Sequence, residues 1–377
     1  MAAPPITQAN VGGHFLSAQT AIRNCVSVHR ASAADGHWYS WENFCRLLAL
    51  DPFCSNIEDP IPIFQAFAAG YRAGDYAPSG RQVRSRTVED ALRAVGQTIA
   101  LLGPRDPRLT DGKLNLRLRN LLTSYAKEDP PPHRVKPIPL AVLKNIANIA
   151  AQPTADAAQQ ATADMITLGF FFLLRPGEYT NTPSESTPFR LCDVILSEGQ
   201  NRIDWCTATT EEIRRATHVK LVFTTQKNGV RNEVICNGRS GDSQFCPTLA
   251  AIRRILHLKQ HQASNTSPLA CYYTGTKWRS VSATEISTTL KHAVTIFGPS
   301  LGFLPQEVSS RSLRASGAMA LLVAGVDTDR IKLMGRWRSD AMLRYLTVQA
   351  EPIMRHFAEK MLQGDYVLHA NGTVPLH

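Results

Sequence analysis

The sequence lacks the short motifs that mark the commonest enzyme classes. It has no G-x-x-x-x-G-K-[ST] phosphate-binding loop, no H-E-x-x-H zinc-protease motif and no G-x-S-x-G hydrolase motif. Its eight cysteines are single, without one C-x-x-C pair. A zinc ribbon and a dense disulfide framework are therefore excluded, and the cysteines are typical of reduced, mostly buried thiols in an intracellular protein.

Long apolar runs are scarce as well. The longest, residues 165–174, ends next to an arginine and is too short to span a bilayer. Residues 1–20 contain no charged start followed by an apolar run, as a secretory signal would. We therefore expect a soluble, intracellular protein with no membrane partner, which would be nuclear if the source is eukaryotic.

Positive charge is what the sequence has in excess. Its 377 residues include 41 Lys and Arg against 31 Asp and Glu, a net charge of +10. Cations that neutralise phosphates release counterions and so drive binding, which makes a polyanionic partner plausible for such a chain. Hydrophobic residues make up 44% of the sequence, enough for two domains with cores of their own.

The N-terminal part has helical periodicity. After a patternless stretch over 1–20, apolar residues recur at i, i+3, i+4 and i+7 in Trp41, Phe44, Cys45 and Leu48. The same pattern predicts helices over 38–50, 62–70 and 87–102, the last opening on a capping box at Thr87. We predict an all-helical domain over 21–126.

A proline-rich stretch follows this domain. Residues 127–139 contain five prolines among polar and basic residues. Proline ends helices and cannot join a central strand, so this stretch predicts an extended, semi-rigid linker. A larger domain is expected over 140–362, followed by a tail over 363–377.

The larger domain combines helices with a small antiparallel sheet. Helices are expected over 140–151 and 155–174, and the alternation over 218–225 predicts a strand that pairs with 230–236. Between the two strands, Asn228-Gly229 is a strong hairpin signal. It would place Lys227 at the hairpin tip. The predicted fold class is mainly α with a small antiparallel β-sheet, that is, α+β.

Two arginines mark the start of a later predicted helix over 309–325. Arg311 and Arg314 are three residues apart, so we expect them on one side of the helix. Two guanidinium groups on one face form a strong clamp for phosphate oxygens. A solvated helix face is the alternative for an isolated pair of this kind.

A turn and a tyrosine follow these arginines. Asp327 is placed to cap a short helix that ends at Gly335, where a sharp turn would present Arg336 and Trp337. The next predicted helix, capped by Ser339, carries Tyr345. A lone tyrosine at helical spacing is usually a core residue. Its basic setting makes Tyr345 a candidate nucleophile.

A further arginine lies far upstream. Arg175 directly follows the apolar run over 165–174, and Glu178 is placed three residues on to orient it. A charge fixed to a rigid core helix suits preorganised phosphate binding. An ordinary ion pair at a helix end is the alternative interpretation.

In this order and spacing the residues resemble the catalytic motifs of the tyrosine recombinases, the family of phage-type integrases and of recombinases of eukaryotic mobile elements. The resemblance covers about residues 136–361 and more loosely includes the helical N-terminal domain as the DNA-binding half of a two-domain clamp. The matching positions are Arg175, Lys227, Arg311-x-x-Arg314, Gly335-Arg336 and Tyr345, nine residues after Arg336.

The resemblance implies a site-specific DNA recombinase or integrase that acts without cofactor or metal. Tyr345 would attack the scissile phosphorus and form a 3′-phosphotyrosyl link. Arg175 and Arg314 would hold the non-bridging oxygens, and Lys227 would protonate the leaving 5′-oxygen. The partners implied are double-stranded DNA and three further copies of the chain, as a tetramer on two duplexes.

The chain departs from the family at two positions. Arg311 stands where histidine is usual, and Arg336 stands where histidine or tryptophan is usual. Because arginine does not accept a proton near neutral pH, Arg311 is not a general base for Tyr345. The expectation is that Arg311 donates to the phosphate, that Arg336 supplies the usual hydrogen-bond donor, and that Trp337 packs beside it.

Two other functions remain open from the sequence. One is a DNA-binding protein derived from a recombinase that binds without cutting, and the other is a type IB topoisomerase. Retention of Arg175, Lys227, Arg314 and Tyr345 favours strand cleavage. If Tyr345 is not the nucleophile, Tyr366 is the next candidate.

Overall fold

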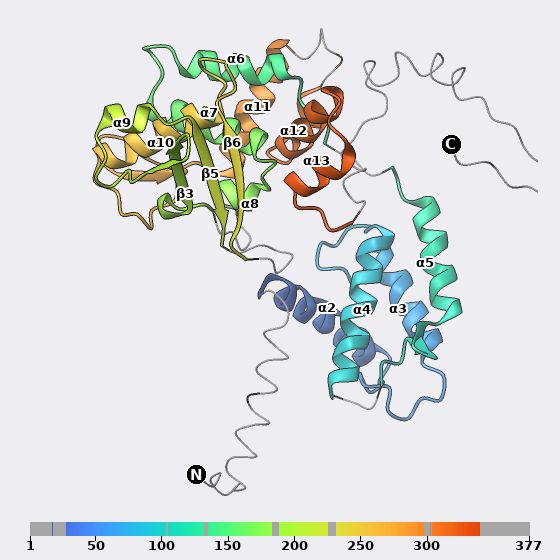
Figure 1. Cartoon of the computed structure of the whole chain (residues 1–377). Helices are drawn as coiled ribbons and strands as arrows, with labels where there is room; N and C mark the ends of the chain where they lie inside the picture. The colour runs from blue at the N-terminus through green and yellow to red at the C-terminus, as the bar shows by residue number, and fades with distance from the viewer. Residues whose placement is uncertain are drawn as a thin grey trace, which may run out of the picture. The chain divides into compact units, whose positions relative to one another are not determined.

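The computed structural model describes residues 17, 28–102, 105–131, 135–182, 188–224, 231–297, 302 and 304–339. The chain divides into two compact units, one ending at Pro132 and the other beginning at His133. Each unit has its own cluster of buried apolar side chains. Figure 1 shows the helices and strands of both units.

Helices dominate the first unit. Its aromatic core is centred on Trp41, whose ring stacks on that of Phe64 at a centroid distance of 4.7 Å and meets Phe67 edge to face at 5.1 Å. Phe44 is buried beside them, as its spacing predicts. The elements are α2 (Val28–Leu47), α3 (Ile61–Ala73), α4 (Ser85–Leu102), β1 (Leu109–Thr110), β2 (Lys113–Leu114) and α5 (Leu116–Glu128).

Three details of this unit differ from the sequence-based expectation. The unit is not all helical, because β1 and β2 form a short antiparallel hairpin. Leu48 lies beyond the end of α2 and is 51% exposed, so it does not share the apolar face. The start of α4 is at Ser85 rather than at a Thr87 cap, because Ser85 donates from its amide (2.9 Å) and its hydroxyl (2.5 Å) to Asp129.

The second unit is an α+β unit, which confirms the predicted fold class. Its small strands lie among a larger number of helices (Figure 1). The helices are α6 (Leu140–Ala150), α7 (Ala157–Phe171), α8 (Pro176–Tyr179), η1 (Leu191–Asp193), α9 (Thr210–Arg214), α10 (Pro247–Gln260), α11 (Ala283–Phe297), η3 (Pro305–Glu307), α12 (Ser312–Val323) and α13 (Thr328–Met334). The strands are β3 (Val194–Glu198), β4 (Asn201–Ile203), β5 (His218–Phe223), β6 (Glu233–Gly238), β7 (Cys271–Tyr273) and β8 (Trp278–Ser280).

The main sheet has the strand order β4-β3-β5-β6, with every pair antiparallel. Val219, Leu221 and Phe223 of β5 are buried on one face, as the alternating pattern predicts. In the β5–β6 register Phe223 lies opposite Glu233. β3 and β4 were not predicted, and neither were β7 and β8.

Helix α7 is the central element of the second unit. A capping box between Asp156 and Gln159 fixes its start. Along its length α7 packs against α6, α10, α11 and α12, so it is buried nearly all round. At its C-terminal end, α12 comes close because Gly317 lies against the main-chain oxygen of Phe170. Because α7 leads to Arg175 and α12 carries Arg314, this close packing sets the spacing of the candidate site.

The proline-rich stretch is joined to both units by specific contacts. At its start, Asp129 ends α5 and accepts from Arg72 at 2.7 Å. Near its end, Ile138 is buried in the core of the second unit and donates its amide to the Ser316 hydroxyl at 2.7 Å. The Lys136 amide likewise donates to the Glu307 carbonyl at 2.8 Å. Packed structure therefore extends into both ends of residues 127–139.

Among the described residues, no helix is long and apolar enough to cross a membrane.

The close approach of α12 to α7 predicts a cost for any side chain at position 317. We expect Gly317→Ala to lower the free energy of unfolding by about 1–3 kcal/mol, because the added methyl group overlaps the Phe170 carbonyl. Gly36→Ala is the matched control, since space around this α2 glycine is open. It should stabilise the protein by about 0.5–1 kcal/mol. Calorimetry of both variants checks this, and equal stability would contradict the packing argument.

Candidate phosphodiester site

The candidate site begins where α7 ends. Leu173 takes a left-handed backbone conformation with φ of 51°. Its amide donates to Phe170 and that of Leu174 donates to Gly169, the hydrogen bonds of a Schellman turn. Glycine usually occupies this position, because a side chain costs about 1–2 kcal/mol there. The turn leaves the carbonyl groups of Phe172 and Leu173 available to side chains from elsewhere in the unit.

Helix α13 ends in the same kind of turn. The Arg336 amide donates to Leu333 at 2.9 Å and the Trp337 amide donates to Lys332 at 3.0 Å. Arg336, with φ of 58°, takes the left-handed position, whereas Gly335 has an ordinary helical φ of −78°. The predicted cap at Asp327 and the predicted end of the helix are confirmed. The sharp turn itself is at Arg336 and not at Gly335, which corrects the prediction.

Arg175 and Glu178 are paired at the start of α8. The Arg175 guanidinium donates to Glu178 Oε1 and its amide donates to Oε2, both at 2.8 Å. The Arg175 side chain is 32% exposed and that of Glu178 is 12% exposed. Of the two, the arginine is thus the group that remains open to an anion.

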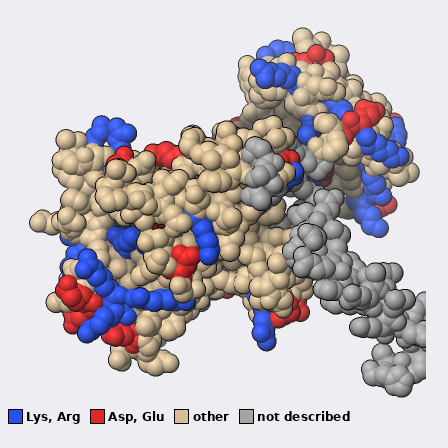
Figure 2. Space-filling model, turned by 90° about the horizontal axis from the view of Figure 1, so that it is seen from above, with Lys and Arg blue, Asp and Glu red and all other residues tan. Residues whose placement is uncertain are grey.

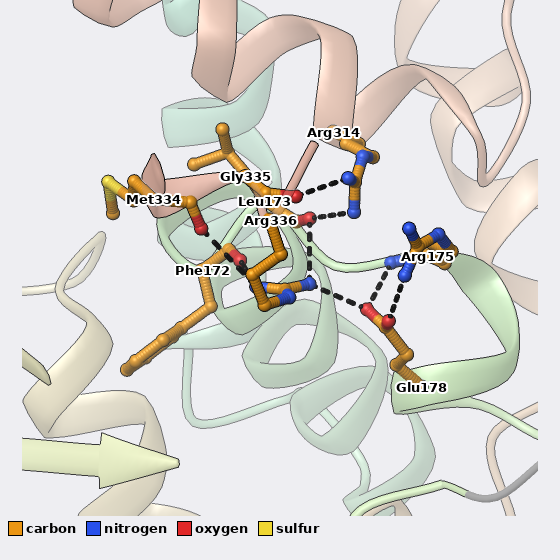
Figure 3. A network of polar contacts seen from close by, with 8 residues as sticks. All are labelled: Phe172, Leu173, Arg175, Glu178, Arg314, Met334, Gly335 and Arg336. Atoms are coloured by element: carbon orange, nitrogen blue, oxygen red, sulfur yellow. Dashed lines mark hydrogen bonds and ion pairs between the residues drawn. The ribbon is translucent and has the colours of Figure 1, made fainter. Parts of the chain in front are cut away.

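Arg336 contacts this pair from inside the protein. Its side chain is 1% exposed and donates to Glu178 Oε2 at 2.9 Å. It also donates to the carbonyl groups of Phe172 (3.2 Å), Met334 (3.4 Å) and Leu173 (3.5 Å), which Figure 3 shows. On its other side the guanidinium lies 3.8 Å from the ring centre of Phe223, at the end of β5. Burial lowers the pKa of this guanidinium, and Glu178 opposes that shift.

Arg314 joins the ends of the two helices. It donates from Nη1 to the Leu173 carbonyl at 2.8 Å and from Nη2 to the Gly335 carbonyl. Its guanidinium lies 4.2 Å from the ring centre of Trp337. A cation at two helix C-termini is favoured by both helix dipoles. Figure 3 shows Arg314 and Arg175 on the same side of the network.

Arg311 does not share this environment. It precedes α12 at the N-cap position and is exposed, whereas Arg314 is 4% exposed. The two predicted clamp residues therefore differ in burial, which the spacing alone did not indicate. The reason is that Arg314 turns inward to the carbonyl groups of two helix ends.

Tyr179 links α8 to the start of α12. Its buried hydroxyl donates to the Ser310 carbonyl at 2.9 Å. Burial raises the pKa of Tyr179 well above its ordinary value, so the phenol stays protonated and remains a donor. This contact fixes the segment of Arg175 relative to the helix that carries Arg314.

Three of the residues predicted from sequence lie outside the described residues: Lys227, Tyr345 and the alternative nucleophile Tyr366. The Asn228-Gly229 turn and the helix predicted after Ser339 lie outside them as well. The strands on either side of residues 225–230 are described, and they pair as an antiparallel hairpin requires.

The structure adds participants that the sequence pattern did not indicate. The carbonyl groups of Phe172 and Leu173 act as acceptors, and Phe223 supports Arg336. Glu178 was paired with Arg175 alone, yet it also binds Arg336. One available signal was the absence of glycine after α7, where Leu173 takes the left-handed position; Gly335 follows α13, so there was no such signal for Arg336. A residue other than glycine takes the left-handed conformation only when other contacts hold it there.

No family model and no curated protein matched the sequence. Among solved structures, the chain is similar to the integrase of transposon Tn1549 in complex with transposon right-end DNA. The identity is 13% and the TM-score 0.45, over 85% of this chain and 92% of that chain. The complex of that integrase with circular intermediate DNA gives 13% and 0.43, over 79% and 84%.

A second similar structure is that of XerA recombinase, with 13% identity and a TM-score of 0.37 over 92% of this chain and 97% of that chain. Because the identity is low, the roles of Arg175, Arg314 and Arg336 are argued from the contacts of this chain, and those of Lys227 and Tyr345 from the sequence motif.

The two arginines at Glu178 predict a strong dependence of stability on that carboxylate. Glu178→Ala leaves the buried Arg336 guanidinium without its carboxylate, so the unfolding free energy should fall by about 3 kcal/mol. Adding Arg336→Met removes the buried charge, and the double variant should recover most of the loss. Urea unfolding, with hydrogen exchange of α12 as the readout of this unit, measures both.

Glu198→Ala is the control for this experiment. The Glu198 side chain is 48% exposed and its pair with Arg215, at 3.6 Å, is a surface pair, so the change should stay within about 0.5 kcal/mol. A Glu178 variant that behaves like the control would contradict the described network.

Proposed function

We propose that the protein is a tyrosine-type DNA recombinase that cleaves and rejoins DNA strands through a phosphotyrosyl intermediate. The observation that carries the proposal is the arginine network of the second unit. Arg175, Arg314 and Arg336 come from three distant segments and meet around Glu178 and the ends of two helices. Such a concentration of fixed cations suits a phosphodiester.

In the proposed mechanism, the partly exposed Arg175 and its neighbour Arg314 neutralise the non-bridging oxygens of the scissile phosphate. Tyr345 attacks the phosphorus, its phenolic proton passes to solvent water, its oxygen forms a bond to phosphorus, and the bond to the 5′-oxygen breaks. Lys227 gives a proton to the departing 5′-oxygen. The energy of the phosphodiester is kept in the 3′-phosphotyrosyl bond, so a 5′-hydroxyl of another strand reverses the reaction.

The two unusual positions take different roles in this proposal. Arg311 is exposed at the start of α12, where it is placed to contact the DNA backbone rather than to accept a proton. Arg336 is turned into the protein, toward Glu178 and main-chain carbonyl groups. In this proposal Arg336 does not donate to the phosphate.

Double-stranded DNA is the proposed partner. On the face shown in Figure 2, basic and acidic side chains are interspersed in both units, so no single-sign surface marks a DNA path there. The net charge of +10 supports attraction to DNA in general. Strand exchange between two duplexes needs four cleavages, so we propose a tetramer of the chain as the active assembly.

A second candidate function is a DNA-binding protein that no longer cuts. The observation that favours it is the combination of arginine at positions 311 and 336, which supplies neither a proton acceptor nor an open donor at position 336. Both candidates bind DNA, so covalent chemistry distinguishes them.

The nucleophile is tested on DNA selected by the protein itself. Duplexes that bind are selected from a random-sequence pool, and a nick is then moved along the selected site one base at a time. The wild type should form a protein–DNA adduct that survives denaturant on one of these substrates. Tyr345→Phe should abolish it with binding retained, and Tyr366→Phe, the matched control, should leave it. Absence of any wild-type adduct on bound DNA would favour the non-cutting protein.

The role of Lys227 is tested by changing the leaving atom. Lys227→Ala should slow adduct formation by about 10²–10⁴-fold, the usual effect of losing a general acid. With sulfur in place of the 5′-bridging oxygen, the rate should return to nearly that of the wild type, because a thiolate leaves without a proton. Lys220→Ala, on β5, should change neither rate. A defect that sulfur does not relieve would assign Lys227 another role.

A further inference from the structure

The turn after α13 has contacts that neither the family resemblance nor the proposed function explains. Gly335 and Trp337 contact Arg314 directly. Arg336 contacts Glu178, the partner of Arg175. All three do so from a buried or half-buried position. These three residues therefore hold an arginine in place rather than contact DNA themselves.

One set of contacts holds Arg314. The Gly335 carbonyl accepts from Arg314 Nη2, and the Trp337 ring lies under the guanidinium at 4.2 Å. Trp337 reaches this position because residue 335 has no side chain, since a Cβ there would overlap the indole ring. A hydrogen bond and a ring together fix both the direction and the plane of the Arg314 guanidinium.

A second set of contacts holds Arg175, and it meets the first at the Leu173 carbonyl, which accepts from Arg314 at 2.8 Å and from Arg336 at 3.5 Å. Arg336 donates to Glu178 Oε2 at 2.9 Å, while Arg175 donates to Oε1 of the same carboxylate at 2.8 Å. The Arg336 guanidinium is itself fixed between the Phe172 carbonyl and the Phe223 ring. Arg336 thus holds the Glu178 carboxylate through Oε2, and Oε1 accepts from the Arg175 guanidinium.

The backbone of the turn points the same way. Arg336 keeps a left-handed conformation that costs about 1–2 kcal/mol for a residue with a side chain, whereas glycine would take it without that cost. The guanidinium contacts offset this cost in the folded protein.

We infer that Gly335-Arg336-Trp337 is a positioning element that orients the two phosphate-binding arginines mainly through different contacts, Arg175 through Arg336 and Glu178, and Arg314 through Trp337 and the Gly335 carbonyl. This inference rests on the proposed function for its consequence in catalysis. The geometry itself is independent of that function and is tested without DNA.

The direct test is side-chain NMR of the arginine Nε–Hε groups in the full chain. Arg336→Gly satisfies the turn and removes the guanidinium, so the protein should fold and Arg175 should gain much more motion than Arg314. Trp337→Leu should give the opposite pattern. Arg338→Met, at an exposed neighbouring arginine, should change neither. Unchanged order of Arg175 in Arg336→Gly would overturn the inference, whatever the function of the protein.

The catalytic consequence is tested by double-mutant cycles on the single-turnover rate of adduct formation. Arg336→Gly should lower the rate by about 10–100-fold with little change in the Kd for the selected duplex, and Arg336→Lys should restore part of it. In an Arg175→Met background the Arg336 change should have little further effect, because both act through one group. In an Arg314→Met background most of its effect should remain, because Arg336 and Arg314 share only the Leu173 carbonyl.

Trp337→Leu should show the reverse dependence, with no further effect once Arg314 is replaced. Independent, multiplying effects of Arg336 and Arg175 would mean that Arg336 contacts the phosphate itself, which overturns the inference. Failure of the proposed function looks different, because the wild type would then form no adduct while the NMR pattern is retained. If Trp337→Leu does not fold, Trp337→Phe takes its place in both measurements.

Discussion

The candidate site depends on one physical constraint, the junction between the C-terminal ends of α7 and α13. Both helices end in left-handed turns formed by residues other than glycine. The carbonyl groups left open by the two turns are joined by Arg314, which donates to Leu173 on one side and to Gly335 on the other. A cation between two helix C-termini is stabilised by both dipoles, and it holds the helix ends at a fixed separation.

The remaining contacts of the site follow from this junction. With α7 and α13 fixed, Arg336 is directed into the space between Glu178 and Phe223. Glu178 then has one oxygen left for the Arg175 guanidinium. Arg175 is the most exposed of the three arginines that meet here, at 32% for its side chain, so the network ends in an open cation supported by buried ones. Such preorganisation is what electrostatic catalysis of phosphoryl transfer requires.

Sequence reasoning located several helices better than it located the contacts of the arginines. The apolar run before Arg175, the alternation along β5 and the Asp327 cap each reflect local rules, and each is confirmed. Short strands such as β4 and β7 carry too few residues for a period-2 pattern to be recognised. Their pairing depends on the rest of the unit.

The orientation of the arginine side chains could not be predicted from their spacing in the sequence. Arg311 and Arg314 are three residues apart, but burial separates them because Arg314 finds carbonyl acceptors from distant helices. The inward direction of Arg336 likewise depends on Glu178, which is 158 positions away. The roles of Lys227 and Tyr345 remain predictions from the motif.

The most direct measurement is a structure of the full chain bound to a selected duplex that carries the intact scissile phosphate. The account predicts that Arg175 and Arg314 donate to non-bridging oxygens of that phosphate, that Tyr345 faces the phosphorus, and that Arg336 stays hydrogen-bonded to Glu178. A phosphate bound away from Arg175 and Arg314, or one held directly by Arg336, would contradict it.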